Sequence, residues 1–132
     1  MDGHGLPLSI VVTGANRHDV SQLEKVLNER IINPVHETEE NLCADAGYTG
    51  EPAKQIIIEH GFIPHVRSRG EEKVNMKKGY KPRRWIVEVT HSWFNRFRKV
   101  LVRFEKKSAN YEALLHLTAS MIIYRKLGVI YG

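Results

Sequence analysis

Residues 83–107 read RRWIVEVTHSWFNRFRKVLVRFEKK, the stretch of this 132-residue chain in which charge and aromatic side chains are most concentrated. It holds both tryptophans, three of the four phenylalanines and eight Lys or Arg residues, but only two acids, Glu88 and Glu105. A solvated helix usually mixes acids and bases at i,i+4 spacing, so a lone Glu88 among cations and aromatics is unusual. Glu88 is therefore a candidate metal ligand.

Apolar residues in this stretch recur at helical spacing from Arg84 onward. One face of the predicted helix carries Ile86, Val89, Trp93, Phe97 and Val100. A second stripe, also at steps of three and four, carries Arg84, Glu88, His91, Asn95 and Arg98. The pattern thus predicts a helix that buries an apolar seam and turns Glu88 away from it. A last helix, nearly uncharged, is predicted from about residue 110 to 127, packed on a sheet or on the preceding helix.

The first 66 residues alternate apolar runs with helical patterns. After a DGHG turn, a buried strand is predicted over residues 8–13, then a helix with Asp19 as its N-cap and Pro34 as its end. NLCAD is predicted as a buried strand with Asp45 at its carboxyl end. A helix over residues 51–60 and a strand over residues 62–66 follow. This order indicates an α/β domain with mainly parallel strands. Residues 67–83 are basic and polar, which indicates a linker or insertion.

Composition fits one soluble globular domain, with 42% hydrophobic and 27% charged residues. The single cysteine, Cys43, excludes an internal disulfide and a cysteine-rich zinc site, and its apolar neighbours predict a small buried side chain. Uninterrupted apolar runs fall short of the roughly 18 residues of a membrane span, and the first residues lack the features of a signal peptide. We expect a cytoplasmic protein.

The net charge of +5 is distributed unevenly. Residues 1–66 carry a balance of −6, residues 67–107 carry +10, and residues 108–132 carry +1. Basic residues interleaved with aromatic ones are typical of a surface that binds a polyanion such as nucleic acid. The alternative is a solvated basic face that only maintains solubility.

Asp45 and Glu88 are the two carboxylates whose positions indicate chemistry. Mg²⁺ prefers oxygen ligands and is usually held by one or two carboxylates with phosphate oxygens and water. If the helix brings Glu88 over the carboxyl end of the sheet, the pair could hold an ion that promotes phosphodiester cleavage. The alternative is that Asp45 is a local cap and that Glu88 is simply exposed.

Four stretches of the chain, in the same order, resemble the carboxy-terminal part of the DDE transposases of bacterial insertion sequences, in the related families numbered four and five. They are DGHGLPLSIVVTGANRHD at 2–19, ADAGYTG at 44–50, RWIVEVTHSWFNRFRKVLVRFEK at 84–106 and NYEALLHLTASMIIYRKL at 110–127. The resemblance implies an RNase H-like mixed sheet with flanking helices. It also implies transposition of double-stranded DNA by metal-dependent strand cleavage and transfer.

The resemblance assigns roles to individual residues. Asp45, in a D-x-G-Y setting with Gly47 and Tyr48, matches the second catalytic Asp; Glu88 matches the Glu, and Arg84 matches the Arg four residues before it. Asp45 and Glu88 would then hold Mg²⁺ or Mn²⁺ in a two-metal site. The residues expected to contact the DNA of the transposon ends are Arg83, Arg84, Arg96, Arg98, Lys99, Arg103, Lys106 and Lys107.

The first catalytic Asp of the family lies on a strand that precedes the DGHG turn. We therefore expect residues 1–132 to form an N-terminally truncated domain that lacks the first two strands and is inactive alone. The alternative is a non-catalytic fragment that binds DNA or associates with an intact transposase. A third possibility is complementation by a separately encoded upstream fragment.

Overall fold

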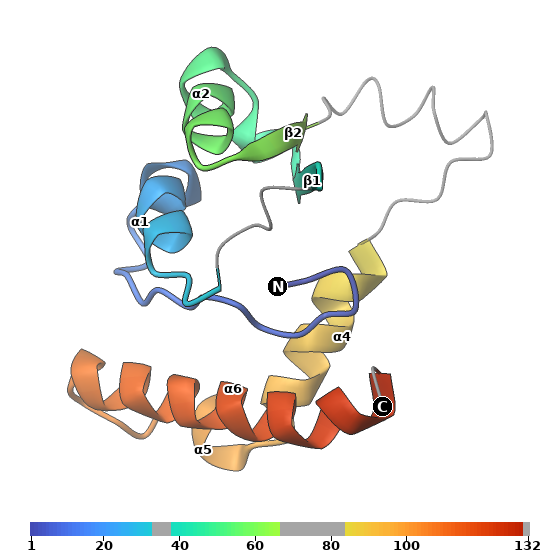
Figure 1. Ribbon diagram of the computed structural model, residues 1–132. Coiled ribbons are helices and arrows are strands. Elements are labelled where there is room, and N and C mark those ends of the chain that lie inside the picture. Colours follow the sequence, from blue (N-terminus) through green and yellow to red (C-terminus); the bar gives the residue numbers. More distant parts are fainter. Residues whose placement is uncertain (33–37, 67–83, 131–132) are drawn as a thin grey trace. The chain divides into compact units, whose positions relative to one another are not determined.

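The computed structural model describes residues 1–32, 38–66 and 84–130, except the side chain of Arg84 (Figure 1). The predicted linker at residues 67–83, and with it Arg83, lies outside the described residues. The chain divides into two compact units. Unit 1 combines Met1–Val12 with Arg83–Gly132, and unit 2 comprises Thr13–Pro82.

Unit 2 is built on two parallel strands, β1 (Glu40–Ala44) and β2 (Phe62–Val66), joined by helix α2 (Glu51–Glu59). Their register pairs Glu40 with Phe62 at one end and Ala44 with Val66 at the other. Parallel neighbours need a crossover connection, which α2 supplies. The predicted parallel α/β arrangement is therefore confirmed for these strands.

A small apolar cluster holds unit 2 together. Leu23 and Leu27 of helix α1 (Leu23–Asn28) pack with Ala53 and Ile57 of α2, and Ile57 is fully buried. The partly buried residues around them are Val20, Leu42, Tyr48, Ile56, Phe62 and Val66. The alternation of burial along β1 and β2 turns Leu42 and Val66 toward this cluster.

Three predictions for unit 2 were wrong in detail. Asp19 is the first residue of the 3-10 helix η1 (Asp19–Gln22), and the N-cap position belongs to His18. Helix α1 ends at Asn28, well before Pro34. Beyond this end the Arg30 side chain turns back, and its Nε donates to the Leu27 carbonyl at 2.9 Å. Cys43 is exposed, because the pleat of β1 turns it to the face opposite Leu42 and Ala44.

Unit 1 packs an N-terminal segment with three helices: α4 (Arg84–Asn95), α5 (Arg98–Leu101) and α6 (Ser108–Ile130). The single helix predicted from Arg84 onward is interrupted after Asn95, and Phe97 takes an extended conformation as the N-cap of α5. Ile86 and Val100 are buried as the apolar seam predicts. Arg98 consequently lies on α5 and not on the helix that carries Glu88.

The strand predicted over residues 8–13 is absent, since no β-ladder includes those residues in the described part of the chain. A strand requires a hydrogen-bonded neighbour, and β1 and β2 pair with each other. The preceding DGHG turn is well defined: Asp2 Oδ1 accepts hydrogen bonds from the backbone N–H groups of His4 at 2.9 Å and Leu6 at 2.8 Å. Two backbone hydrogen bonds, from Asp2 N to the Leu6 carbonyl at 2.9 Å and from Gly5 N to the Asp2 carbonyl at 3.2 Å, close the turn together with this side chain.

Thr90 fixes this N-terminal turn to α4. Thr90 is 3% exposed, and its hydroxyl lies 2.6 Å from the Gly5 carbonyl and 3.1 Å from the Ile86 carbonyl, so it donates to an acceptor in either segment. Gly5 adopts a φ of +90°, and a Cβ there would lie 3.0 Å from Thr90 Oγ1. The close approach of backbone to helix therefore requires glycine at this position.

Candidate metal and nucleic-acid site

Asp45 stands at the point where β1 ends and the 3-10 helix η2 (Ala46–Tyr48) begins. Its Oδ1 accepts a hydrogen bond from the Gly47 backbone N–H at 2.8 Å, so it caps η2. The side chain is exposed, so an ion from solvent can reach it. A local cap and a metal ligand are compatible, because a carboxylate has two oxygens and only Oδ1 makes the capping bond.

Gly47 keeps that carboxylate in place. A Cβ added to Gly47 would lie 3.0 Å from Asp45 Oδ1, which is tighter than ordinary contact. The D-x-G-Y pattern thus has a local physical reason, since glycine lets the backbone approach its capping oxygen closely. The pattern orients the Asp45 carboxylate whether or not an ion binds.

Tyr48, the last residue of the same pattern, connects the site to the core of unit 2. Its ring packs against the apolar cluster. Burial raises the pKa of the Tyr48 phenol above its usual value of 10.0, and the negative charges of Asp19 and Asp45 raise it further. Sequence reasoning assigned Asp19 only to a helix cap; the structure brings its charge close enough to influence Tyr48.

This pKa shift predicts a pH dependence of stability. Because the folded state holds the Tyr48 proton more tightly than the unfolded state, the associated stabilisation is complete below pH 10 and is lost as the pH rises through the folded-state pKa. We expect the free energy of unfolding to fall more steeply above pH 10 in the wild-type chain than in Tyr48→Phe. Urea unfolding at a series of alkaline pH values measures this difference. Equal slopes would contradict the burial of this phenol.

Glu88 lies in the middle of α4 and is exposed, as are His91 and Asn95 on the later turns of the helix. The prediction that Glu88 is turned away from the apolar seam is therefore confirmed. The Arg84 backbone begins the same helix one turn earlier. Asp45 belongs to unit 2 and Glu88 to unit 1. That the two carboxylates come close enough to share an ion therefore stays a prediction.

The chemistry of the donors fits a hard cation only in part. Two exposed carboxylates are the ligand type that Mg²⁺ and Mn²⁺ take. Within residues 1–32, 38–66 and 84–130, no group of three or more His, Cys, Asp or Glu side chains is arranged to hold a metal ion. Further oxygen ligands would have to come from water, from DNA phosphate or from residues outside the described ones.

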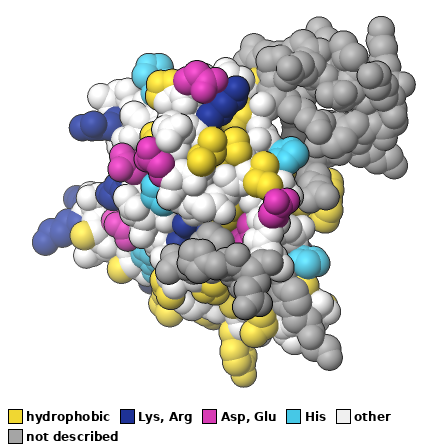
Figure 2. All heavy atoms as spheres, turned by 45° about the horizontal axis from the view of Figure 1, so that its top comes forward, with side chains coloured by type: hydrophobic (Ala, Val, Ile, Leu, Met, Phe, Trp, Pro, Cys, Tyr) yellow, Lys and Arg dark blue, Asp and Glu magenta, His cyan; other side chains and the backbone are white. Residues whose placement is uncertain are grey.

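The predicted DNA-contacting cations that the structure describes are all exposed and all belong to unit 1. They are Arg96, Arg98, Lys99, Arg103, Lys106 and Lys107. Arg103 also stacks on the Tyr111 ring, with 5.0 Å between the guanidinium carbon and the ring centroid. On the face of the molecule in Figure 2, Lys and Arg side chains lie among acidic and uncharged ones.

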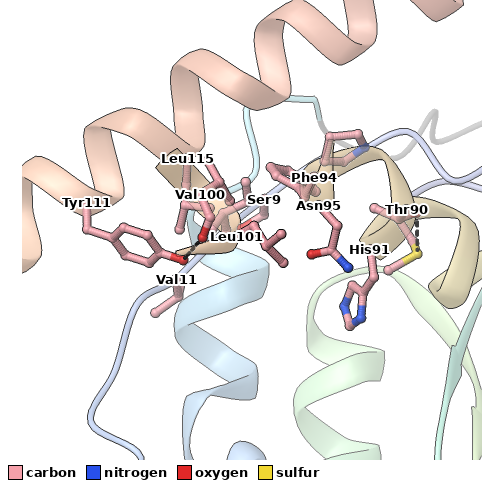
Figure 3. A pocket seen from close by; sticks show the side chains of 13 residues that line it. Ser9, Val11, Thr90, His91, Phe94, Asn95, Val100, Leu101, Tyr111 and Leu115 are labelled. Carbon is pink, nitrogen blue, oxygen red and sulfur yellow. Dashed lines mark hydrogen bonds between the residues drawn. The ribbon is translucent and has the colours of Figure 1, made fainter. Parts of the chain in front are cut away.

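Unit 1 also contains an open cavity of about 570 Å³. Figure 3 shows its walls: Ser9 and Val11 from the N-terminal segment, His91 and Asn95 from α4, and Tyr111 from α6. The Tyr111 hydroxyl donates to the Val100 carbonyl at 3.3 Å. Neither Glu88 nor Asp45 lines this cavity, so it is not the predicted metal site.

Thr90 was missed by sequence reasoning, which placed Val89 in the apolar seam. Val89 is only half-buried, whereas Thr90 is buried and joins α4 to the N-terminal turn. Its position four residues after Ile86 places it on the buried face, and that spacing could have identified it.

Comparison with known proteins identifies the family. Residues 1–123 match the family model described as a transposase DDE domain. The chain is 31% identical over 133 aligned residues to a putative transposase for insertion sequence element IS402 from Burkholderia cepacia. That alignment covers 96% of this chain and 61% of the relative, and no solved structure matches the chain. Since the family match extends over most of its length, the chain belongs to the transposase DDE domain family of insertion sequences.

Proposed function

We propose that residues 1–132 form part of an RNase H-like catalytic domain that cleaves and joins DNA strands during transposition, in the cytoplasm. The supporting observation is an exposed carboxylate, Asp45, held at the end of a parallel strand by the D-x-G-Y geometry. Open α/β sheets place ligand sites at the carboxyl ends of their strands. The family match supports transposition as the process.

In this proposal Asp45 and Glu88 hold Mg²⁺ or Mn²⁺, and Arg84 lies one turn from Glu88 to contact a phosphate oxygen. A bound divalent ion supplies activation of the attacking water or hydroxyl and charge stabilisation at the leaving oxygen. The cap from Gly47 fixes the Asp45 carboxylate before binding, which lowers the entropic cost of ordering it. The exposed cations of unit 1 hold the DNA backbone of the transposon ends.

The chain spans 61% of the length of its relative. In the proposed assignment, the first carboxylate of the family triad lies on a strand that precedes the DGHG turn. We infer that residues 1–132, tested as a separate polypeptide, bind an ion weakly and do not cleave DNA. Cleavage would need a third carboxylate from an additional segment or from an intact transposase. A role limited to binding DNA or an intact transposase is the second candidate, favoured by the exposed cations of unit 1.

Metal titration tests the shared site. Mn²⁺ binding is measured by calorimetry for the wild-type chain, Asp45→Asn, Glu88→Gln and the double variant. We expect each single variant to weaken binding by about tenfold or more, since removing even a supporting residue of a metal site has effects of this size. If both carboxylates hold one ion, the double variant should be little weaker than either single variant.

Glu105→Gln is the matched control, because Glu105 is the other acid of the basic stretch and has no predicted role in the site. Two independent, additive losses would contradict a shared ion. A supplementary assay incubates each variant with DNA and Mg²⁺. Strand nicking by residues 1–132 alone that Asp45→Ala abolishes would disprove the need for a further carboxylate.

A further inference from the structure

The cavity of unit 1 serves neither the proposed metal site nor the predicted DNA contacts, since none of those side chains lines it. Its volume of about 570 Å³ falls in the range of roughly 300–1,000 Å³ that small-molecule sites have. The N-terminal segment, α4, α5 and α6 each contribute a wall, and all of them belong to unit 1. The shape of the cavity therefore follows from packing within one compact unit.

The lining of the cavity contains no acidic side chain, lysine or arginine among the described residues. A phosphate group taken into such a cavity would lose water without gaining an opposite charge, which is costly. A divalent ion would lack the carboxylates that it takes as ligands. The lining thus favours a neutral ligand over an anion, a metal ion or a stretch of DNA backbone.

Two side chains of α4 supply hydrogen-bonding groups to the cavity. His91 and Asn95 are four residues apart, which places them on the same side of the helix, and Figure 3 shows the ring and the amide next to each other. Within the described part of the chain, neither side chain makes a hydrogen bond or an ion pair with another residue. Both are therefore available to a ligand.

Other polar side chains of the lining already use their protons inside the protein. The Thr90 hydroxyl donates to the Gly5 or Ile86 carbonyl, and the Tyr111 hydroxyl donates to the Val100 carbonyl. The wall formed by His91 and Asn95 is consequently the one that specifies the polar edge of a ligand.

Apolar groups form much of the remaining lining. Figure 3 shows Val11, Leu115 and the aromatic rings of Phe94 and Tyr111 around the same space. Aromatic rings in a protein stack on other flat rings or contact them edge to face. A ligand that fits this lining is flat and apolar on its faces, with hydrogen-bonding atoms along one edge.

An asparagine amide presents an acceptor and a donor side by side, and the edge of adenine that carries N6 and N7 presents the complementary pair. We propose that this cavity binds a free purine nucleoside, adenosine, with Asn95 Oδ1 accepting from N6, Asn95 Nδ2 donating to N7 and His91 adding a further hydrogen bond. The ribose lies toward the open side of the cavity. A base within a DNA strand would bring phosphates to a lining without cations, so the free nucleoside is favoured. This binding goes beyond the proposed catalytic function and does not depend on it.

Isothermal titration calorimetry of the full chain with adenosine tests the proposal. A ligand of this size predicts a dissociation constant on the order of 100 µM. Asn95→Leu, which keeps the volume and removes both amide groups, should weaken binding by about tenfold or more. His91→Phe should weaken it by about fivefold, the effect of one hydrogen bond. Asn110→Leu is the matched control, because Asn110 is exposed on α6 outside the lining, and it should bind adenosine as the wild type does.

Two analogues remove the same contacts from the ligand and leave the protein unchanged. Purine riboside lacks the amine at N6, and 7-deazaadenosine has a carbon in place of N7. Each should bind the wild-type chain about fivefold more weakly than adenosine does. Asn95→Leu should bind all three nucleosides equally, because the group that distinguishes them is then absent. The analogues decide the question even where a substitution unfolds the chain, which circular dichroism detects.

Four outcomes would overturn the proposal. The first is no heat of binding at adenosine concentrations about ten times the expected dissociation constant. The second is equal affinity of the folded Asn95→Leu and Asn110→Leu variants. The third is a wild-type chain that binds the three nucleosides equally. The fourth is binding that requires an oligonucleotide with an unpaired adenine and that Asn95→Leu abolishes, because a base of DNA is then the occupant.

Discussion

Gly5→Ala is expected to destabilise unit 1 by about 2–3 kcal/mol, since two costs combine at this position. An alanine at a φ of +90° is strained, because its Cβ crowds its own backbone. The same Cβ would lie 3.0 Å from Thr90 Oγ1 and 3.5 Å from the Ile86 carbonyl oxygen, so the buried hydrogen bond between Thr90 and Gly5 must shift. Urea unfolding followed by tryptophan fluorescence measures the loss, because both tryptophans belong to unit 1.

Gly3→Ala is the matched control for this prediction. Gly3 belongs to the same turn, has no positive φ, and a Cβ there meets nothing within 4 Å. Its free energy of unfolding should equal or slightly exceed that of the wild type, because alanine restricts the unfolded chain. Thr90→Ala should lower the free energy of unfolding less in the Gly5→Ala background than in the wild type, since Gly5→Ala has already disturbed the hydrogen bond between Thr90 and Gly5. Equal stability of Gly3→Ala and Gly5→Ala would show that the turn does not pack on α4.

Removal of the exposed cations of unit 1 is expected to abolish most DNA binding. The variant changes Arg96, Arg98, Lys99, Arg103, Lys106 and Lys107 to Gln, all of which are exposed. Each phosphate contact contributes about 0.9 to the slope of log affinity against log salt, so six contacts would contribute about 5. We expect binding to a 30-base-pair duplex to weaken at least ~100-fold near 50 mM salt and to lose most of its salt dependence. Fluorescence anisotropy at several salt concentrations measures both quantities.

Two controls separate DNA binding from net charge and from metal chemistry. Arg17→Gln/Lys25→Gln removes exposed cations from unit 2 and should reduce the affinity only slightly. Glu88→Gln should retain binding in the absence of divalent ions, because it removes a negative charge and no cation. If each cation of unit 2 contributed as much to DNA affinity as each cation of unit 1, the prediction would be wrong. The surface of unit 1 would then be only a solvated basic face.

The spacing of apolar residues predicted correctly those helices and strands whose conformation depends mainly on their own residues. Helix α2 and the parallel strands β1 and β2 formed at the predicted places, because alternating or helical apolar spacing turns Leu42, Ala53 and Ile57 toward one cluster. The burial predicted for β1 was wrong, since the strand alternates between half-buried and exposed residues and ends at Ala44. The place of Asp45 at a strand end followed from the same reasoning. The alternative reading of Asp45 as a cap was also correct, since its carboxylate bonds to Gly47 N.

Errors occurred where an element depends on a partner distant in sequence. The apolar run at residues 8–13 has strong strand propensity, yet in the described part of the chain it has no strand beside it. Cys43 was predicted to be buried from its neighbours, but exposure depends on which face of the two-stranded sheet is covered. The break between α4 and α5 likewise has no Pro or Gly to signal it.

The sequence by itself determined the family, the α/β order of elements, the basic character of residues 83–107 and the exposure of Glu88 on its helix. These follow from residue type and spacing, which act over one or two turns of chain. Only the tertiary structure decided that Thr90 joins α4 to the Gly5 turn and that Tyr48 is half-buried near the charges of Asp19 and Asp45. Those features depend on which surfaces pack together. Burial brings together residues that are far apart in the sequence, so their spacing along the chain does not predict the contact.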